Sequence, residues 1–252
     1  MNAGSPAPAG EGVSFFFPAY NEEANVEFMI SEASALLSTL GVPWEVIVVD
    51  DGSTDATARL TLEAAQKTPG VRLVSHGRNL GFGAAVRSGI AAARHPWIFY
   101  TDCDGQFDLG EFRQVWDLRG MCDIVSGYRR NRKDPGLRLV YSACYSTLVW
   151  LLFWGGFKDV DCSFKLYRRS VFDRVRPRAT CGVIDLEILL LARGMGMRVV
   201  QIPVSHRPRR AGSVSFETVR HGFIAWVKPG AILEMAAQLW RLRTRTWRGD
   251  VG

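Results

Sequence analysis

The chain has 252 residues, 47% of them hydrophobic and 22% charged, which excludes general disorder and suits one large globular domain or a domain with an appendage. Its five cysteines are an odd number without a C-x-x-C pair, which argues against a disulfide framework or a structural zinc site and favours buried thiols. The net charge of +6 is concentrated in residues 207–248, where nine basic side chains accompany only Glu217 and Glu234, so we expect a local anionic partner: phosphate, a membrane surface or nucleic acid.

Residues 1–12 are rich in Pro, Gly and other small residues and lack a basic-then-apolar signal pattern, so we expect a loose leader on a cytosolic chain. After it, short apolar runs alternate with helical patterns. That alternation predicts an α/β fold with a mainly parallel sheet, helices on both of its faces, and ligands beyond the carboxyl ends of its strands. The expected strands are residues 14–18, 45–50, 71–75, 97–101 and 123–126, and the expected helices are residues 22–40, 54–67, 83–94 and 109–118.

The second half of the chain is less regular. Residues 139–157 carry no charge, and this length approaches that of a membrane span. Polar residues and a Gly-Gly pair within the stretch weaken that interpretation, which leaves a helix lying in the membrane interface, or a plain core or oligomer contact, as alternatives. The remaining elements expected are a strand at 164–167, a helix at 185–193, a strand at 198–203, and a helix from about residue 216 that breaks near Pro229-Gly230.

The first strand runs into the sequence FPAYNEE. Pro18 cannot continue a strand ladder, so we expect the chain to leave the sheet there with its backbone open to a ligand. Glu22 and Glu23 are also the residue type that suits a helix N-terminus. On its own this motif is a weak functional signal.

The second strand ends in Asp50 and Asp51. One of these carboxylates can accept hydrogen bonds from a base or a ribose. Ser53 or Thr54 is expected to cap the next helix, with Asp55 in its first turn. Asp50 has no such structural explanation.

The third strand is followed by RNLGFGAA at residues 78–85. The G-x-G within it fails as a dinucleotide fingerprint, because it follows the third strand and lacks the last glycine. We instead expect the backbone N–H groups of this loop, together with Arg78 and Asn79, to face a pyrophosphate where the helix starts at Gly83.

The fourth strand is followed by Asp102-x-Asp104-x-Gln106. Alternate residues of an extended segment face the same side, so two carboxylates and an amide oxygen are expected to converge. Such hard oxygen ligands suit Mg²⁺ or Mn²⁺, with diphosphate oxygens and water completing the coordination shell. The metal would neutralise charge on a departing diphosphate.

Taken in order, FPAYNEE, VVDDGST, RNLGFGAA and TDCDGQF resemble glycosyltransferase family 2 with its GT-A fold. Two later segments also resemble the family: SGYR at 126–129, a strand ending in an arginine, and DCSFK at 161–165, a D-x-x-S-G-F-type segment. The likeness is greatest to dolichyl-phosphate mannose synthases and bacterial polyprenyl-phosphate sugar transferases. It implies a catalytic domain over residues 13–215 and a helical, basic segment over residues 216–252.

The resemblance also implies roles for individual residues. The loop at 207–215 is similar to an R-x-x-G-x-S closing loop of the family, but its serine is shifted and a common lysine is absent, so the acting arginine among Arg207, Arg209 and Arg210 stays open. The implied contacts are Pro18, Tyr20, Glu22, Asp50 and Asp51 to the nucleoside, Asp102, Asp104 and Gln106 to the metal and diphosphate, and Arg129, Arg138 and one of Arg209 and Arg210 to phosphate groups.

The choice of acceptor depends on whether a base is needed. An alcohol must lose a proton as it attacks, whereas a phosphate monoester is already ionised near neutral pH and needs arginines to position it. The arginines near 129–138 and 207–210 favour a polyprenyl phosphate acceptor, which would receive the hexose in a single in-line displacement with inversion. Asp185 and Glu187 are the candidate bases for the alternative, a soluble enzyme that acts on a saccharide or natural-product hydroxyl, although Glu187 also suits a plain helix surface.

The basic end predicts where the protein resides. Trp and Leu residues lie between its arginines, which favours an anionic membrane surface over nucleic acid, with a dimer contact as the alternative. We therefore expect a peripheral protein on the cytoplasmic face of a membrane, with a donor of the GDP-mannose or UDP-glucose type. A non-catalytic nucleotide-binding protein conflicts with the intact acidic motif. The residues expected at the membrane are Trp226, Trp240, Trp247, Arg241, Arg243, Arg245 and Arg248.

Overall fold

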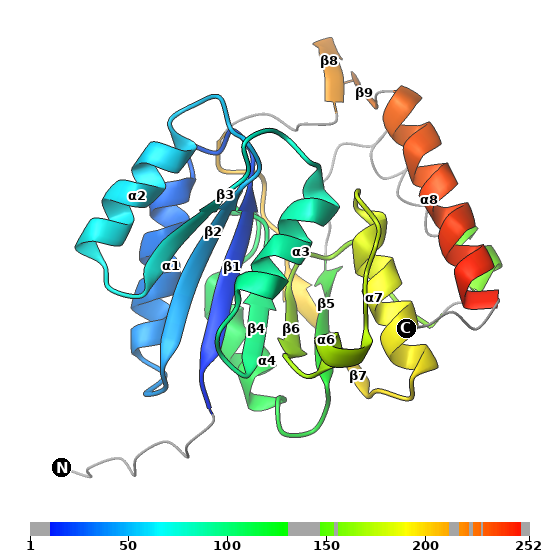
Figure 1. Cartoon of the computed structure of the whole chain (residues 1–252), viewed down its shortest axis with the longest axis horizontal. Helices are drawn as coiled ribbons and strands as arrows, with labels where there is room; N and C mark the ends of the chain where they lie inside the picture. Colours follow the sequence, from blue (N-terminus) through cyan, green and yellow to red (C-terminus); the bar gives the residue numbers. More distant parts are fainter. Residues whose placement is uncertain are drawn as a thin grey trace.

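The computed structural model describes residues 11–130, 147–153, 156–211, 217–221, 224–227 and 229–247. Its centre is a seven-stranded sheet in the order β3-β2-β1-β4-β6-β5-β7 (Figure 1). β6 runs antiparallel to both of its neighbours and the other pairs are parallel, which confirms the mainly parallel sheet. The strands are β1 (Val13–Ala19), β2 (Trp44–Asp50), β3 (Val71–Ser75), β4 (Trp97–Tyr100), β5 (Ile124–Arg130), β6 (Lys165–Arg168) and β7 (Val199–Ser205).

Helices cover both faces of this sheet. Residues 147–153 are also helical. The helix expected from residue 22 begins only at Val26, because the side chains of Glu22 and Asn25 are bound to each other and to the loop after β7. The helices are α1 (Val26–Ser38), α2 (Thr57–Lys67), α3 (Phe82–Ala92), the 3-10 turn η1 (Leu109–Glu111), α4 (Phe112–Asp117), α6 (Val171–Arg174), α7 (Val183–Gly194) and α8 (Pro229–Trp247).

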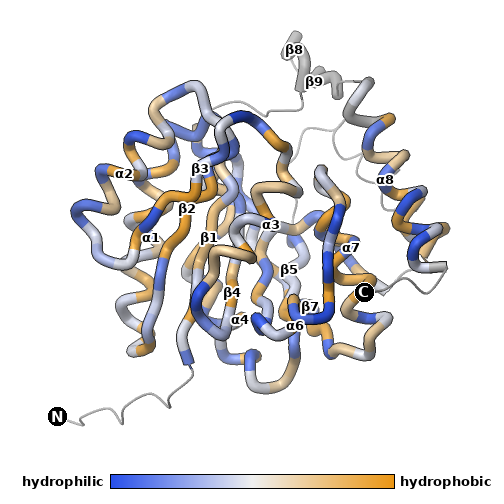
Figure 2. The backbone as a smooth tube through the Cα atoms, in the orientation of Figure 1, coloured by the Kyte–Doolittle hydropathy of each residue, from blue (hydrophilic) through white to orange (hydrophobic). Residues whose placement is uncertain are grey.

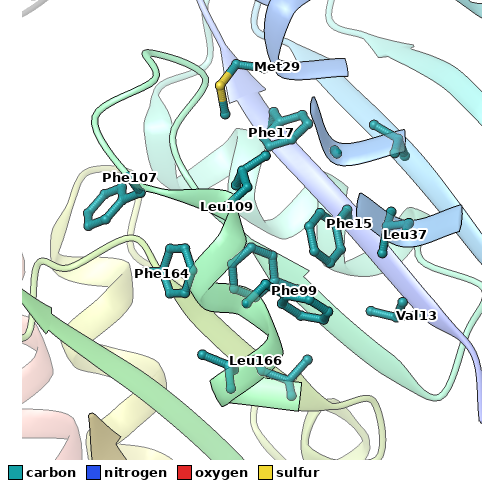
Figure 3. Packing of buried hydrophobic residues seen from close by; sticks show 14 of the residues in the cluster. Val13, Phe15, Phe17, Met29, Leu37, Phe99, Phe107, Leu109, Phe164 and Leu166 are labelled. Atoms are coloured by element: carbon teal, nitrogen blue, oxygen red, sulfur yellow. The ribbon is translucent and has the colours of Figure 1, made fainter. Parts of the chain in front are cut away.

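Strand alternation sends successive side chains into two different cores. Phe15 and Phe17 of β1 join a cluster with α1 and α4 on one face, whereas Phe16 joins α3, α6 and α7 on the other. Aromatic rings pack against one another in the first cluster (Figure 3). The ring centroid of Phe99 lies 4.5 Å from that of Phe15 and 4.7 Å from that of Phe164. Hydrophobic residues accordingly concentrate on the central strands, and polar residues on the outer helical surfaces and loops (Figure 2).

Two expectations about secondary structure were wrong. In place of the helix expected from about residue 216, the described residues form two strands: β8 (Glu217–His221) and β9 (Ile224–Val227) pair in antiparallel fashion and are rich in the β-branched and aromatic residues that strands favour. The helix starts only at Pro229, whose fixed φ suits a first helical position. β1 also continues through Pro18 instead of ending there, because β4 pairs with β1 only as far as Phe16 and no ladder bond is required of the proline on that side.

Close packing of α3 on β1 makes Gly89 necessary. A Cβ atom at this position would lie 2.3 Å from Cδ2 of Phe16. We expect Gly89→Ala to lower the free energy of unfolding by about 1–2 kcal/mol, because overpacking outweighs the gain in helix propensity. Chemical denaturation tests this, with Gly77→Ala as the control, since nothing lies within 4 Å of its Cβ position. Equal stability of the two variants would contradict the packing argument.

Candidate active site

Several side chains selected from the sequence lie in loops at one edge of the sheet. Loops that follow β1, β2, β3, β4 and β7 leave the sheet at their carboxyl ends, and β6 begins at the same edge because it runs antiparallel. This is the edge at which open α/β sheets bind ligands.

Arg209 joins three of these loops. Its guanidinium forms ion pairs with Glu22 and, at 3.1 Å, with Oδ2 of Asp104, and its Nε donates to the carbonyl of Ala211 at 2.9 Å. Asn25 completes the junction by donating to Oε2 of Glu22 at 2.7 Å and to Ala211 at 3.1 Å. Burial raises the pKa of Glu22, and the hydrogen bond from Asn25 and the charge of Arg209 offset part of that rise.

The neighbouring arginines are turned elsewhere. Arg207 pairs with Asp108, and Arg210 stacks over the ring of Phe28 with 3.8 Å between its Cζ and the ring centroid. Of the three arginines that the sequence left open, Arg209 is therefore the one that reaches the acidic loops.

Asp102 has less compensation. Ser163 Oγ donates to its carboxylate, but burial and the adjacent charge of Asp104 raise its pKa to about 7. Two carboxylates that repel each other in a partly buried loop form a donor set that a divalent cation would stabilise. Within the described ranges no cluster of three or more His, Cys, Asp and Glu side chains forms a metal site, so diphosphate oxygens and water would have to supply the remaining ligands.

Gln106 does not join the two aspartates. Its side-chain amide donates to the carbonyl of Arg207 at 3.1 Å, and its backbone N–H donates to Oδ1 of Asp104 at 3.0 Å. The expectation of three converging ligands assumed an extended segment, but Gly105, with φ of 72°, reverses the chain. Gln106 therefore holds the loop after β7 in this structure, and its role as a metal ligand stays a prediction.

Asp51 organises the glycine loop. Its carboxylate accepts the N–H groups of Leu80 and Gly81, both at 2.9 Å, and lies 2.7 Å from Nδ1 of His76. The N–H groups expected to face a pyrophosphate thus bind Asp51 instead, and the side chain is only 3% exposed. This departs from the nucleoside contact implied for Asp51.

Asp50 and the rest of the glycine loop are placed as follows. Asp50 accepts a hydrogen bond from the N–H of Ser53 at 3.1 Å and one from Ser75 Oγ at 3.3 Å. Arg78 and Asn79 are exposed, and Tyr20 is half-buried at the end of β1. Gly83 is buried, and its N–H donates to the carbonyl of Thr180.

The arginine that ends the SGYR motif is held by an acidic loop. Arg129 forms a two-pronged ion pair with Asp159, through Nε at 2.7 Å and Nη2 at 2.8 Å. Burial lowers the pKa of Arg129, but Asp159 more than offsets this and the net shift is upward. Burial raises the pKa of Asp161, in the same loop, to about 7 despite the charge of Arg129. Arg138 lies outside the described residues.

Neither candidate base is available as the sequence suggested. Asp185 is 2% exposed, accepts a hydrogen bond from Tyr100 and pairs with Lys165 at 3.0 Å. Burial raises its pKa, and the charge of Lys165 counteracts this. Glu187, 3% exposed, pairs with Arg245 of α8 at 2.6 Å. Glu187 is therefore neither a surface carboxylate nor one facing the acidic loops.

Sequence reasoning missed four residues that shape the site: Asn25, His76, Asp159 and Ser163. Each acts by binding a residue that the sequence did select. Ser163 and Asp159 lie in or beside the DCSFK segment, so the motif itself was a signal for them. Asn25 and His76 carried no signal, because their partners come from loops distant in sequence.

The arrangement joins carboxylates that suit a divalent cation to arginines that suit phosphate, at one sheet edge. A model of the family Glycosyl transferase family 2 matches residues 14–176. Among curated proteins, a dolichyl-phosphate beta-glucosyltransferase of Dictyostelium discoideum is 30% identical over 77% of this chain and 65% of its own length. An undecaprenyl-phosphate 4-deoxy-4-formamido-L-arabinose transferase of Klebsiella pneumoniae is 30% identical over 84% of this chain and 65% of its own. This chain thus spans slightly less than two thirds of those relatives.

Solved structures show the same fold. Mannosyl-3-phosphoglycerate synthase from Rubrobacter xylanophilus matches with a TM-score of 0.66 and 20% identity, over 95% of this chain and 74% of that one. Glucosyl-3-phosphoglycerate synthase from Mycobacterium tuberculosis, solved with Mn²⁺, UDP and glucosyl-3-phosphoglycerate, matches with a TM-score of 0.63 and 22% identity, over 81% and 74% of the two chains. The likeness confirms the GT-A fold.

The raised pKa of Asp161 predicts a pH dependence of stability. An unfolded aspartate ionises near its usual value, 3.8, whereas Asp161 in the fold ionises near 7, so the native state holds the extra proton in between. This contribution to stability is therefore complete below about pH 4 and is lost as the pH rises to 7. We expect the difference in free energy of unfolding between Asp161→Asn and wild type to be roughly 1–2 kcal/mol more favourable to the variant at pH 8 than at pH 5. Denaturant titration of both proteins at both pH values measures this difference. A difference independent of pH would contradict this assignment.

Proposed function

The chain belongs to glycosyl transferase family 2, and we propose that it transfers a hexose from a nucleoside diphosphate sugar to a polyprenyl phosphate. The observation that carries the acceptor class is an apolar cavity of about 290 Å³ beside the Arg129–Asp159 pair. Val160, which lies between Asp159 and Asp161, forms part of its wall. The other lining residues are Thr147, Val149, Trp150, Phe153, Phe157, Lys158, Leu186 and Leu190.

On the donor side, Asp102 and Asp104 are the residues that would hold Mg²⁺ or Mn²⁺. When bound, the metal supplies neutralisation of the charge that develops on the departing diphosphate. Arg209 contacts Asp104 and therefore lies where it can bind a phosphate oxygen of the donor's diphosphate. Glu22 orients that arginine.

On the acceptor side, the proposal needs no base. A phosphate monoester attacks as an anion, and in-line displacement of the diphosphate inverts the anomeric centre. The commitment of Asp185 to Lys165 and Tyr100, and of Glu187 to Arg245, supports this reading. Lys158 lines the cavity, and Arg129, at the end of β5, pairs with Asp159 of the same loop, so both can attract the phosphate head while the prenyl chain enters the apolar space.

Transfer to a hydroxyl is the second candidate, and one observation favours it. Asp161, with a pKa of about 7, has the basicity that suits a general base near neutral pH. If a hydroxyl were the acceptor, Asp161→Asn would remove the acidic limb of the pH–rate profile. With a phosphate acceptor that limb persists.

We also propose that the protein binds peripherally to a membrane, on the cytoplasmic face. The helix at 147–153 and α8 pack on α7 in one cluster, and both keep large apolar side chains exposed: Trp150 at 62%, Leu151 at 64%, Leu233 at 71% and Trp240 at 66%. No helix in the part of the chain that the structure describes is long and apolar enough to cross a bilayer.

The expectation for the basic end needs one correction. Arg245 points inward to Glu187, with 9% of its side chain exposed, and does not belong to the proposed membrane face. Arg241 is exposed on the same helix. The side chains of Trp226 and Trp247, and all of Arg248, lie outside the described residues.

The central prediction concerns the acceptor. Purified protein, Mn²⁺, a panel of radiolabelled nucleotide sugars and a short polyprenyl phosphate should give labelled lipid in organic extracts with one donor. We expect Asp104→Asn to lower the rate by roughly 100-fold, because it removes a metal-binding charge that also fixes Arg209.

The dephosphorylated polyprenol is the matched control acceptor. Label that enters polyprenol, or a saccharide, but not polyprenyl phosphate would overturn the proposed acceptor. Nucleotide-sugar binding without any lipid product would leave the second candidate in its place.

The membrane face makes a separate prediction. We expect the double change Leu233→Ser and Trp240→Ser to reduce sedimentation with phosphatidylglycerol vesicles at least fivefold, because about 2–4 kcal/mol of apolar burial is lost. Leu62→Ser, exposed on the remote helix α2, is the control. Truncation of α8 is a poor test, because Leu239 and Leu242 belong to a buried cluster. Unchanged vesicle binding, with a shift from dimer to monomer in sedimentation velocity, would assign the face to a subunit contact.

A further inference from the structure

Residues 176–181, the segment between α6 and α7, are held almost entirely by side chains of other elements. The segment forms no helix or strand. A stretch of this kind must find partners for its backbone polar groups outside regular secondary structure. Those partners come from α7 and α8 on one side and from α3 and the glycine loop on the other.

Gln238 of α8 binds the end of the segment. Its Oε1 accepts the N–H groups of Thr180 at 2.9 Å and Cys181 at 3.4 Å, and its Nε2 donates to Thr180 Oγ1 at 2.6 Å. Glu234, one turn earlier, accepts from the same hydroxyl at 3.0 Å. Gln238 is only 9% exposed, so these bonds are largely protected from water.

Glu187 and Arg245 bind the beginning of the segment. Oε2 of Glu187 accepts the N–H groups of Arg178 at 2.7 Å and Ala179 at 2.8 Å. Arg245 pairs with Oε1 of Glu187 at 2.6 Å and donates to the carbonyl of Arg176 at 3.2 Å. Four successive N–H groups, 178–181, are thus fixed by Glu187 and Gln238.

The opposite side of the segment touches the glycine loop, backbone against backbone. The carbonyl of Thr180 accepts the N–H of Gly83 at 2.9 Å. A Cβ at Gly81 would lie 2.7 Å from Thr180 O, and one at Gly83 would lie 2.3 Å from Ala179 O. Arg87 of α3 also donates to Ala179. The two backbones are therefore in direct contact at Gly81 and Gly83. A shift of residues 176–181 toward the glycine loop has to move that loop.

We propose that Gln238 and Thr180 are positioning residues through which α8 holds the glycine loop of the donor site in place. The loop in turn fixes Asp51 through the N–H groups of Leu80 and Gly81. The inference rests on the proposed function in so far as it treats this loop as part of the donor site. The opposite face of α8 carries the exposed Leu233 and Trp240 and takes no part in these contacts.

The test breaks the contact between Thr180 and Gln238 in the whole chain. Thr180→Val keeps the shape of the side chain but deletes the hydroxyl, Thr180→Ser restores the hydroxyl, and Gln238→Ala removes the partner on α8. Gln114→Ala, an exposed glutamine on α4, is the matched control. Amide hydrogen exchange of residues 79–85 is followed without any ligand, and donor KM and kcat are followed with the nucleotide sugar that labels polyprenyl phosphate.

We expect Thr180→Val and Gln238→Ala to speed exchange at residues 80, 81 and 83 at least fivefold, and to raise donor KM about tenfold with less than a twofold change in kcat. Thr180→Ser and Gln114→Ala should match wild type. The double variant should equal the stronger single variant, because both changes break one connection.

Exchange at 80–83 equal to that of Gln114→Ala would overturn the proposal. So would faster exchange spread evenly over β1, β2 and β4, which indicates only lower global stability. The exchange measurement uses no substrate. If no nucleotide sugar reacts, the proposed function fails while this measurement still decides the coupling.

Discussion

Carboxylates buried at the carboxyl edge of a sheet are costly unless a cation or several hydrogen-bond donors match each of them, and this requirement organises the whole site. Asp185 is matched by Lys165 and Tyr100, Asp159 by Arg129, and Glu22 and Asp104 share Arg209. Asp51 instead collects backbone N–H groups. These matches join elements or loops that are distant in sequence, so neutralising the charges also fixes those parts of the site relative to one another.

Asp102 is one of two carboxylates, with Asp161, whose charge is poorly balanced, and it lies beside Asp104 where a cation can bind. Its pKa of about 7 reflects burial beside Asp104, with one hydroxyl of Ser163 in compensation. A divalent cation and a nucleoside diphosphate arriving together would bring the missing positive charge and the remaining oxygen ligands. The same edge then holds Arg209 for the donor, and the Arg129–Asp159 pair beside an apolar cavity for the acceptor. Donor and acceptor chemistry thus share one charge balance.

Helix α8, in the basic end of the chain, has one face that points into the domain and one that points outward. Arg245 and Gln238 point into the domain, where they hold residues 176–181, whereas Trp240, Leu233 and Arg241 point outward. Net charge alone does not reveal such a division, because it counts Arg245 and Arg241 alike.

The sequence by itself determined the α/β fold, the strands that carry the acidic motifs and the edge of the sheet where the site lies, because apolar periodicity and strand–loop alternation are local properties. The resemblance implied roles for Asp104 and Arg209 at one site, and the structure joins these two residues by an ion pair. Local patterns did not reveal two arrangements: Gly105 reverses the chain so that the side chain of Gln106 donates to the carbonyl of Arg207, and the antiparallel pair of β8 and β9 replaces an expected helix. Tertiary structure alone decided that Asp185 and Glu187 are paired and that Asp51 holds a loop. The reason is physical: the pairing, burial and pKa of a carboxylate depend on side chains that come from distant parts of the chain.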